Sequence, residues 1–139
     1  MRPQNASTAS LRLLEGISMK FTILGALPDL NEYVNACRTK AYAGHRMSEA
    51  AKSLVGWQLP KPTDIRHPVD IHLSWYEQNN RKDPDNVAFA VKFILDAMVT
   101  AGLLFGDSRR YINSISHTFH TDKERPRIEV LVESTREAA

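Results

Sequence analysis

The stretch from Asn86 to Leu104 limits most strongly how this chain can fold. Apolar residues recur in it at the i, i+3, i+4 and i+7 spacing of a helix with one apolar face, and Gly102 marks its end. The apolar positions are Val87, Ala90, Val91, Ile94, Ala97, Met98 and Ala101. Such a helix has to pack on a second apolar layer, because its apolar face is not stable in water.

Strands are expected to supply that second layer. The residues from Val69 to Trp75 alternate apolar and polar side chains, which is typical of a half-buried strand. Residues 19–24, 111–120 and 127–132 also read as strands, and a polar turn joins the last two. The sequence therefore predicts an α+β fold, in which a single small domain has a mixed sheet of about four strands with two main helices packed on it.

The second of these helices is expected from Glu32 to about Leu54. Either Asp29 or Asn31 is placed to cap its first turn, since both side chains accept hydrogen bonds from free backbone N–H groups. Gly44 lies in the middle of the segment and is a candidate break in the helix.

The two ends of the chain are expected to lie outside the domain. Residues 1–18 are polar, lack the hydrophobic stretch of a signal peptide and read as a flexible extension; the domain spans 19–133, and 134–139 form a frayed tail. No apolar run approaches the roughly 20 residues that cross a bilayer. The single cysteine, Cys37, allows neither an intramolecular disulfide nor a cysteine zinc site. We therefore expect a cytoplasmic protein without a membrane partner.

The formal net charge of +2 is weak evidence for any partner, but the charges are unevenly distributed. Residues 1–66 hold nine Lys and Arg against five Asp and Glu, and residues 67–139 hold nine against eleven. In the helix expected from Glu32 to about Leu54, basic residues are interleaved with Tyr33 and Tyr42. This pattern is typical either of contact with a phosphate backbone and bases or of an ordinary solvated helix face. The basic residues include Arg38, Lys40 and Arg46.

A cluster of charged side chains surrounds the apolar helix. The run Asp83-Pro84-Asp85-Asn86 precedes it, Lys92 and Asp96 lie within it, and Asp107 follows it. Carboxylates at one helix end repel each other, and a bound divalent cation such as Mg²⁺, which prefers oxygen ligands, is one reason to gather them. In an uninterrupted helix Asp85, Lys92 and Asp96 lie on one face.

The same residues also have a structural interpretation. Asp85 or Asn86 can cap the helix, Lys92 and Asp96 can form an i, i+4 ion pair, and Asp107 belongs to a good turn sequence. Asp96 in particular fits a buried acid paired with Lys92 as well as it fits a metal ligand. Capping and metal binding therefore both remain open on the residues alone.

The order and spacing of these residues resemble the RusA family of Holliday junction resolvases. The matching residues are Arg81-Lys82-Asp83-Pro84-Asp85-Asn86, then Lys92-Phe93-Ile94-Leu95-Asp96-Ala97-Met98, then Ala101-Gly102-Leu103, and Asp107. Members of this family are small endodeoxyribonucleases, common in bacteriophages and prophages. The resemblance is strongest over residues 81–107 and looser in the remainder of the domain.

The resemblance implies a site and its ligands. Asp83, Asp85 and Asp107 would bind Mg²⁺, which Mn²⁺ can replace, and Lys92 would complete the catalytic set. Arg81 and Lys82, beside the acids, would contact DNA phosphates. The same role is expected for Arg109, Arg110, Arg38, Lys40 and Arg46. The resemblance also implies a homodimer that acts on four-way DNA junctions in a bacterial cytoplasm.

Two departures from the family pattern stand beside this resemblance. About three extra residues separate Asp85 from Lys92, which is nearly one helical turn and keeps Lys92 on roughly the same face. The family often has two acids at the end of the motif, whereas this chain has Gly106 before Asp107.

The expected function is Mg²⁺-dependent, paired phosphodiester hydrolysis of a four-way junction in DNA recombination and repair. Lys92 would either stabilise the charge on the phosphate or position the attacking water. A less selective nuclease for branched DNA and a non-catalytic DNA-binding protein are the alternatives. His117 and His120 would point to opposite faces of a strand, and we interpret them as surface or sheet-packing residues.

Overall fold

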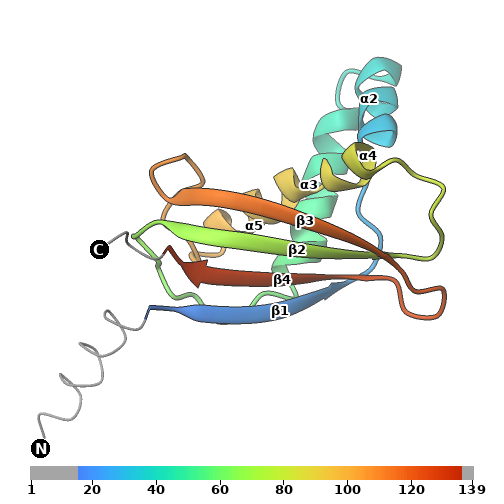
Figure 1. Ribbon diagram of the computed structural model, residues 1–139. Coiled ribbons are helices and arrows are strands. Elements are labelled where there is room, and N and C mark those ends of the chain that lie inside the picture. The colour runs from blue at the N-terminus through green and yellow to red at the C-terminus, as the bar shows by residue number, and fades with distance from the viewer. Residues whose placement is uncertain (1–15, 136–139) are drawn as a thin grey trace, which may run out of the picture.

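Four strands form one mixed sheet that carries the helices on one of its faces (Figure 1). This computed structural model describes residues 16–135. Its elements are β1 (Ser18–Leu24), α2 (Leu30–Thr39), α3 (Ala43–Gly56), β2 (Val69–Glu77), α4 (Pro84–Ala88), α5 (Val91–Thr100), β3 (Ile112–Thr121) and β4 (Arg127–Ser134). The strand order is β1-β4-β2-β3; β2 and β3 are parallel, and the other neighbours are antiparallel. The predicted α+β fold is confirmed.

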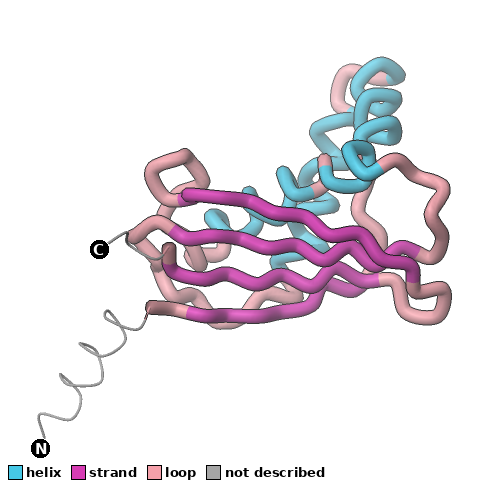
Figure 2. The backbone as a smooth tube through the Cα atoms, in the orientation of Figure 1, coloured by secondary structure: helices cyan, strands magenta, loops and turns pink. Residues whose placement is uncertain are grey.

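The core lies between the sheet and the helices, on the face that Figure 2 shows covered. Alternation in β2 places Ile71, Leu73 and Trp75 in this core, each at most 2% exposed. Phe93 and Ile94 of α5 meet them from the other layer and are fully buried. Burial of side chains of this size contributes about 1.5–3 kcal/mol each, so this layer supplies most of the driving force for folding.

The predicted helix from Asn86 to Leu104 is divided in the structure. It begins two residues earlier, at Pro84, and a tight turn at Phe89 and Ala90 separates α4 from α5. The backbone N–H of Ala90 donates to the carbonyl of Val87, and further i to i−3 bonds follow, as in a 3₁₀ turn. The apolar periodicity survives this turn, which is why the sequence pattern did not reveal it.

The predicted helix from Glu32 to Leu54 is divided as well, but Gly44 is not the break. The chain turns at residues 40–42, and Gly44 lies inside α3. A methyl group at Gly44 would collide with the sulfur of Cys37 on α2. Glycine is therefore needed here for the close approach of two helices.

The ends of the sheet extend slightly beyond the predicted domain limits. The N–H of Ile17 donates to Ser134 Oγ at 2.7 Å, and the N–H of Ser134 donates to the carbonyl of Ile17 at 2.8 Å. Thr135 donates to the carbonyl of Pro68. Residues 17, 18, 134 and 135, which the sequence assigned to the extension and the tail, thus pair with the domain. The remainder of both predicted segments, 1–15 and 136–139, lies outside the described residues.

Asp29 holds the start of α2 and is the one buried charged residue among those described. Its carboxylate accepts from the N–H of Glu32 at 2.8 Å, and Glu32 Oε1 accepts from the N–H of Asp29 at 3.0 Å, which completes a capping box. Lys82 Nζ approaches the same carboxylate at 3.0 Å. Burial raises the pKa of Asp29, but the hydrogen bond from Glu32 and the charge of Lys82 outweigh it, so the pKa lies below its ordinary value.

Asp29→Ala should lower the free energy of unfolding by about 1–2 kcal/mol at neutral pH, since it removes a helix cap. Because the folded state depresses the pKa of Asp29, this stabilisation is present above the ordinary pKa of 3.8 and is lost as the pH falls through the depressed value. Urea denaturation of both proteins at neutral pH and well below pH 3.8 measures the difference. Equal stability at neutral pH would contradict the assignment.

Candidate metal and nucleic-acid site

Asp83 and Asp85 stand at the start of α4 with their carboxylates exposed. Asp83 occupies the N-cap position, yet its side chain makes no capping hydrogen bond. Among residues 16–135, neither carboxylate has an ion pair or a side-chain hydrogen bond. Pro84 at the first helical position fixes the backbone between them. Asp85 therefore does not cap the helix, which the sequence had left open, and both acids are available to a ligand.

Asn86, the last residue of the same run, has a structural role. Its Oδ1 accepts a hydrogen bond at 3.0 Å from the N–H of Asn31, in the first turn of α2. Two neighbouring N–H groups at the start of α2 are thus satisfied. Asp29, the N-cap of α2 itself, accepts from the N–H of Glu32, and Asn86 of α4 accepts from the N–H of Asn31. This contact crosses 55 residues of sequence, so local propensity could not reveal it.

Lys82 was expected to contact DNA, and the structure pairs it within the chain. Its Nζ lies 3.0 Å from Asp29 Oδ2 and 3.9 Å from Glu32 Oε1. The hydrogen bond to Asp29 raises the pKa of Lys82 above its ordinary value. Lys82 therefore ties the loop before α4 to the start of α2. Arg81 beside it is exposed and, among the residues described, has no acidic partner within 4 Å.

Lys92 and Asp96 form the i, i+4 pair that the sequence offered as an alternative. Lys92 Nζ lies 3.7 Å from Asp96 Oδ2, and their side chains are 49% and 31% exposed. The 3₁₀ turn before α5 adds about 20° of rotation for each residue wound in it. This rotation shifts Lys92 from the exact position on the face of Asp85 that a single uninterrupted helix would have given it.

Asp107 lies at the opposite end of the sheet from Asp83 and Asp85. Its loop is fastened to the start of β2, where the N–H of Phe105 donates to Ile65 and the N–H of Val69 donates to Tyr111. Asp83 follows the far end of β2, whose nine residues span about 26 Å. Figure 1 shows the two loops at opposite ends. Accordingly, within residues 16–135 no three His, Cys, Asp or Glu side chains gather as metal ligands.

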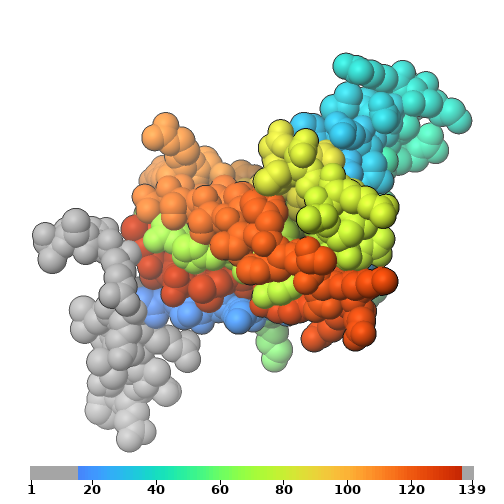
Figure 3. All heavy atoms as spheres, turned by 45° about the vertical axis from the view of Figure 1, so that its right-hand side comes forward, coloured from blue at the N-terminus to red at the C-terminus, as the bar shows by residue number. Residues whose placement is uncertain are grey.

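The other five predicted basic residues fall into two groups. Arg38, Lys40 and Arg46 surround the turn between α2 and α3, where Tyr42 is 72% exposed. This helical hairpin projects from the body of the molecule on the side of α4 (Figure 3). None of the three basic side chains has an acidic partner within 4 Å in the described part of the chain. Arg109 and Arg110 lie with Asp107 at the other end of the sheet.

The two histidines of β3 face opposite sides, as predicted. His117 accepts a hydrogen bond from Trp75 Nε1 at 2.9 Å on the helix-covered side, and burial lowers its pKa. His120 stacks on Tyr76 with ring centroids 4.6 Å apart. Both histidines thus pack against aromatic side chains of β2.

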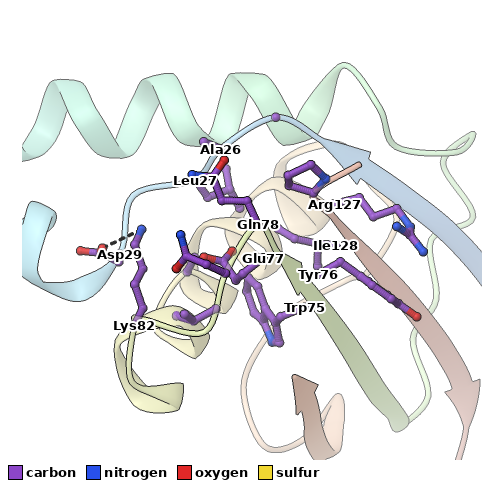
Figure 4. Close-up of a pocket in the computed structure, with 15 residues that line it drawn as sticks. Ala26, Leu27, Asp29, Trp75, Tyr76, Glu77, Gln78, Lys82, Arg127 and Ile128 are labelled. Carbon is purple, nitrogen blue, oxygen red and sulfur yellow. Dashed lines mark ion pairs between the residues drawn. The ribbon is translucent and has the colours of Figure 1, made fainter. Parts of the chain in front are cut away.

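A pocket that no sequence motif indicates lies beside the acidic run. It has a volume of about 480 Å³ and is lined by the end of β2, the start of β4, the loop after β1 and the inner side of α4 (Figure 4). Lys82 and Val87, on either side of Asp83 and Asp85 in the sequence, both line it. Its walls come from four separate segments, so no single motif could have revealed it.

Comparison with known proteins adds no independent identification. No family model and no curated protein matches the chain. The resemblance described above therefore depends on its motif residues alone. None of the helices between residues 16 and 135 is long and apolar enough to cross a membrane.

Asn86→Ala should lower the free energy of unfolding by about 1 kcal/mol, the usual cost of losing a helix cap. Asp85→Asn should change it by less than about 0.5 kcal/mol, because the exposed carboxylate has no partner to lose among residues 16–135. Chemical denaturation of the two variants beside the unaltered protein makes the comparison. A larger loss in Asp85→Asn than in Asn86→Ala would mean that the acid is structural.

Proposed function

We propose that this chain is a Mg²⁺-dependent endonuclease that resolves four-way DNA junctions, as the resemblance to the RusA family implies. The observation that carries the proposal is the state of Asp83 and Asp85. The carboxylates of Asp29, Asp96 and Asp122 all have basic partners. Asp83 and Asp85 have none within residues 16–135, although they flank Pro84 on a fixed turn.

The residues at the start of α4 suit a hard divalent cation, which prefers a small number of carboxylate oxygens. When bound, the ion would lower the pKa of a water molecule and offset charge on the leaving oxygen. Arg81 would hold a flanking phosphate. Lys92 would stabilise charge on the scissile phosphate or orient the water, since its exposed pair with Asp96 is weak and easily exchanged.

A second copy of the chain would supply the missing acid. Asp107 cannot join Asp83 and Asp85 in one chain without rearrangement of the sheet, so the third carboxylate has to come from elsewhere. The exposed edge of β3 favours such a partner. Its ten residues include no Pro, Lys, Arg, Asp or Glu, the residues that usually protect an edge strand from pairing. Ile115 and Phe119 are 39% and 43% exposed along it.

Antiparallel pairing of two β3 strands about a two-fold axis has a direct consequence for the acids. The start of one β3 would lie beside the end of the other. Asp107 of the partner subunit would then lie at the end of the sheet that carries Asp83 and Asp85. Two equivalent sites would result, and their two-fold symmetry fits the paired cuts that a four-way junction requires.

The basic hairpin supports a DNA partner on the same side. Arg38, Lys40 and Arg46 project beyond α4, and Tyr42 among them offers a stacking surface. Phosphate contacts of this kind give affinity without sequence readout and depend steeply on salt. Recognition would thus depend on the shape of the branch.

Purified protein with Mg²⁺ should introduce symmetric paired nicks into a synthetic four-way junction and leave linear duplex intact. Asp85→Asn should reduce the rate by at least about a hundredfold while junction affinity stays within about threefold, because the acid holds the ion and not the DNA. Glu49→Gln on α3, which also removes an exposed carboxylate, is the matched control and should cut normally.

Other outcomes would select other functions. Cutting of flaps, forks and junctions alike would indicate a less selective nuclease for branched DNA. Tight junction binding without cleavage in Mg²⁺ or Mn²⁺ would contradict the catalytic proposal and leave a DNA-binding protein.

A further inference from the structure

The pocket beside the acidic run has an apolar floor and a polar rim. Its floor is formed by Trp75 and Ile128 from the sheet and by Val87 and Ala90 from α4 and the turn after it, all nearly buried. Its volume of about 480 Å³ is ample for one planar heterocyclic ring. Figure 4 shows the Lys82–Asp29 ion pair at one side of the pocket and Arg127 at the other.

The charges around the rim do not favour an anionic ligand. Lys82 is already bound by Asp29 at 3.0 Å. Arg127 is bound by Asp122 and Glu129, each at 2.8 Å, and its guanidinium lies 3.8 Å from the centre of the Tyr76 ring. Both cations of the rim are thus neutralised within the chain, so a phosphate would find no unpaired positive charge here.

The polar groups that remain are suited to the edge of a neutral ring. Glu77 and Gln78 line the pocket, and within residues 16–135 neither side chain has a hydrogen-bond partner. Asn79 accepts from the N–H of Arg81 through Oδ1, which leaves its amide NH₂ group to donate. Amide and carboxylate groups of this kind are the usual partners of exocyclic amino groups and ring nitrogens of nucleobases. The apolar floor of the pocket therefore suits the flat face of a base, and its polar rim suits the hydrogen-bonding edge of the base.

The pocket lies next to Asp83 and Asp85, because residues on both sides of them in the sequence line it. Lys82, which directly precedes Asp83, lines the pocket, and so does Val87, which lies one helical turn after Asp83. α4 thus presents its acids to solvent and its apolar side to the pocket. A nucleotide with its phosphate at Asp83 and Asp85 would have its base near the pocket entrance.

We infer that this pocket receives a single nucleobase, unstacked from the DNA strand whose phosphate lies at Asp83 and Asp85. The inference rests on the proposed function, which brings DNA to this surface. Unstacking a base costs least where it is already unpaired, and the branch point of a junction supplies such bases. The pocket would thereby set the register between the branch and the bond that is cut.

Direct titration with free nucleosides tests the pocket without requiring cleavage. Each of the four deoxynucleosides is added to ¹⁵N-labelled protein, and the two indole N–H signals are followed by NMR. Trp75 lies in the pocket floor, whereas Trp57 is 88% exposed, outside the pocket lining, and serves as the internal control. The Trp75 signal should shift saturably with at least one nucleoside, with a Kd on the order of 1 mM, while Trp57 stays in place. Ribose 5-phosphate, which lacks a base, should leave both signals unmoved.

Two matched variants show whether the binding belongs to this pocket. Ala26→Trp places a ring over the pocket from an exposed position of the loop after β1, and should weaken nucleoside binding at least about tenfold. Ala50→Trp makes the same change at an exposed position of α3 and should bind normally. An unmoved Trp75 signal at saturating nucleoside, an equal shift with ribose 5-phosphate, or unchanged binding by Ala26→Trp would overturn the inference. If the protein binds nucleosides but cuts no junction, the proposed function is rejected and the base-binding role of the pocket is retained.

Discussion

The contact between the start of α2 and the segment before α4 determines where the acids of this protein lie. Asp29 is buried there, caps its own helix and forms an ion pair with Lys82, and the side-chain oxygen of Asn86 accepts a hydrogen bond from the N–H of Asn31 in the first turn of the same helix. Two segments more than fifty residues apart are thereby fixed to each other. Asp83 and Asp85 lie between these two anchors, so the backbone that carries them is held in place at both ends. A buried, hydrogen-bonded charge is costly to leave unpaired, which makes this contact a firm support.

This arrangement separates paired from unpaired polar groups within one short run of the described chain. Lys82 and Asn86 bind the protein itself, whereas no side chain within residues 16–135 pairs with those of Arg81, Asp83 and Asp85. The same division appears at the pocket, where Lys82 and Arg127 are neutralised by acids, whereas the side chains of Glu77 and Gln78 have no hydrogen-bond partner among residues 16–135. A surface that keeps unpaired carboxylates next to an apolar pocket suits a ligand with a phosphate bound through a cation and a flat uncharged ring, and a nucleotide has both.

The sequence could predict the strands and the fold class because β2 and β4 alternate with a strict period of two and the helices carry apolar faces. It could not predict the turn at Phe89, since that turn leaves the apolar spacing intact. Gly44 was misread because glycine in a helix signals a break as readily as a close packing contact, here with Cys37. The acids of the proposed site could be singled out from their order along the chain. Their separation was not, because only the path of β2 shows that Asp107 lies at the other end of the sheet.

Mixing two inactive variants tests most directly whether the site is built from two chains. Asp85→Asn and Asp107→Asn proteins are each assayed alone on a four-way junction with Mg²⁺ and then after unfolding and refolding together. If Asp107 of the partner subunit completes each site, the mixed dimer has one intact site and one doubly altered site, so the mixture should nick single strands although neither variant does alone. If each chain carried its own complete site, both sites of the mixed dimer would be defective. A mixture as inactive as its components, with mixed dimers present, would contradict the shared site.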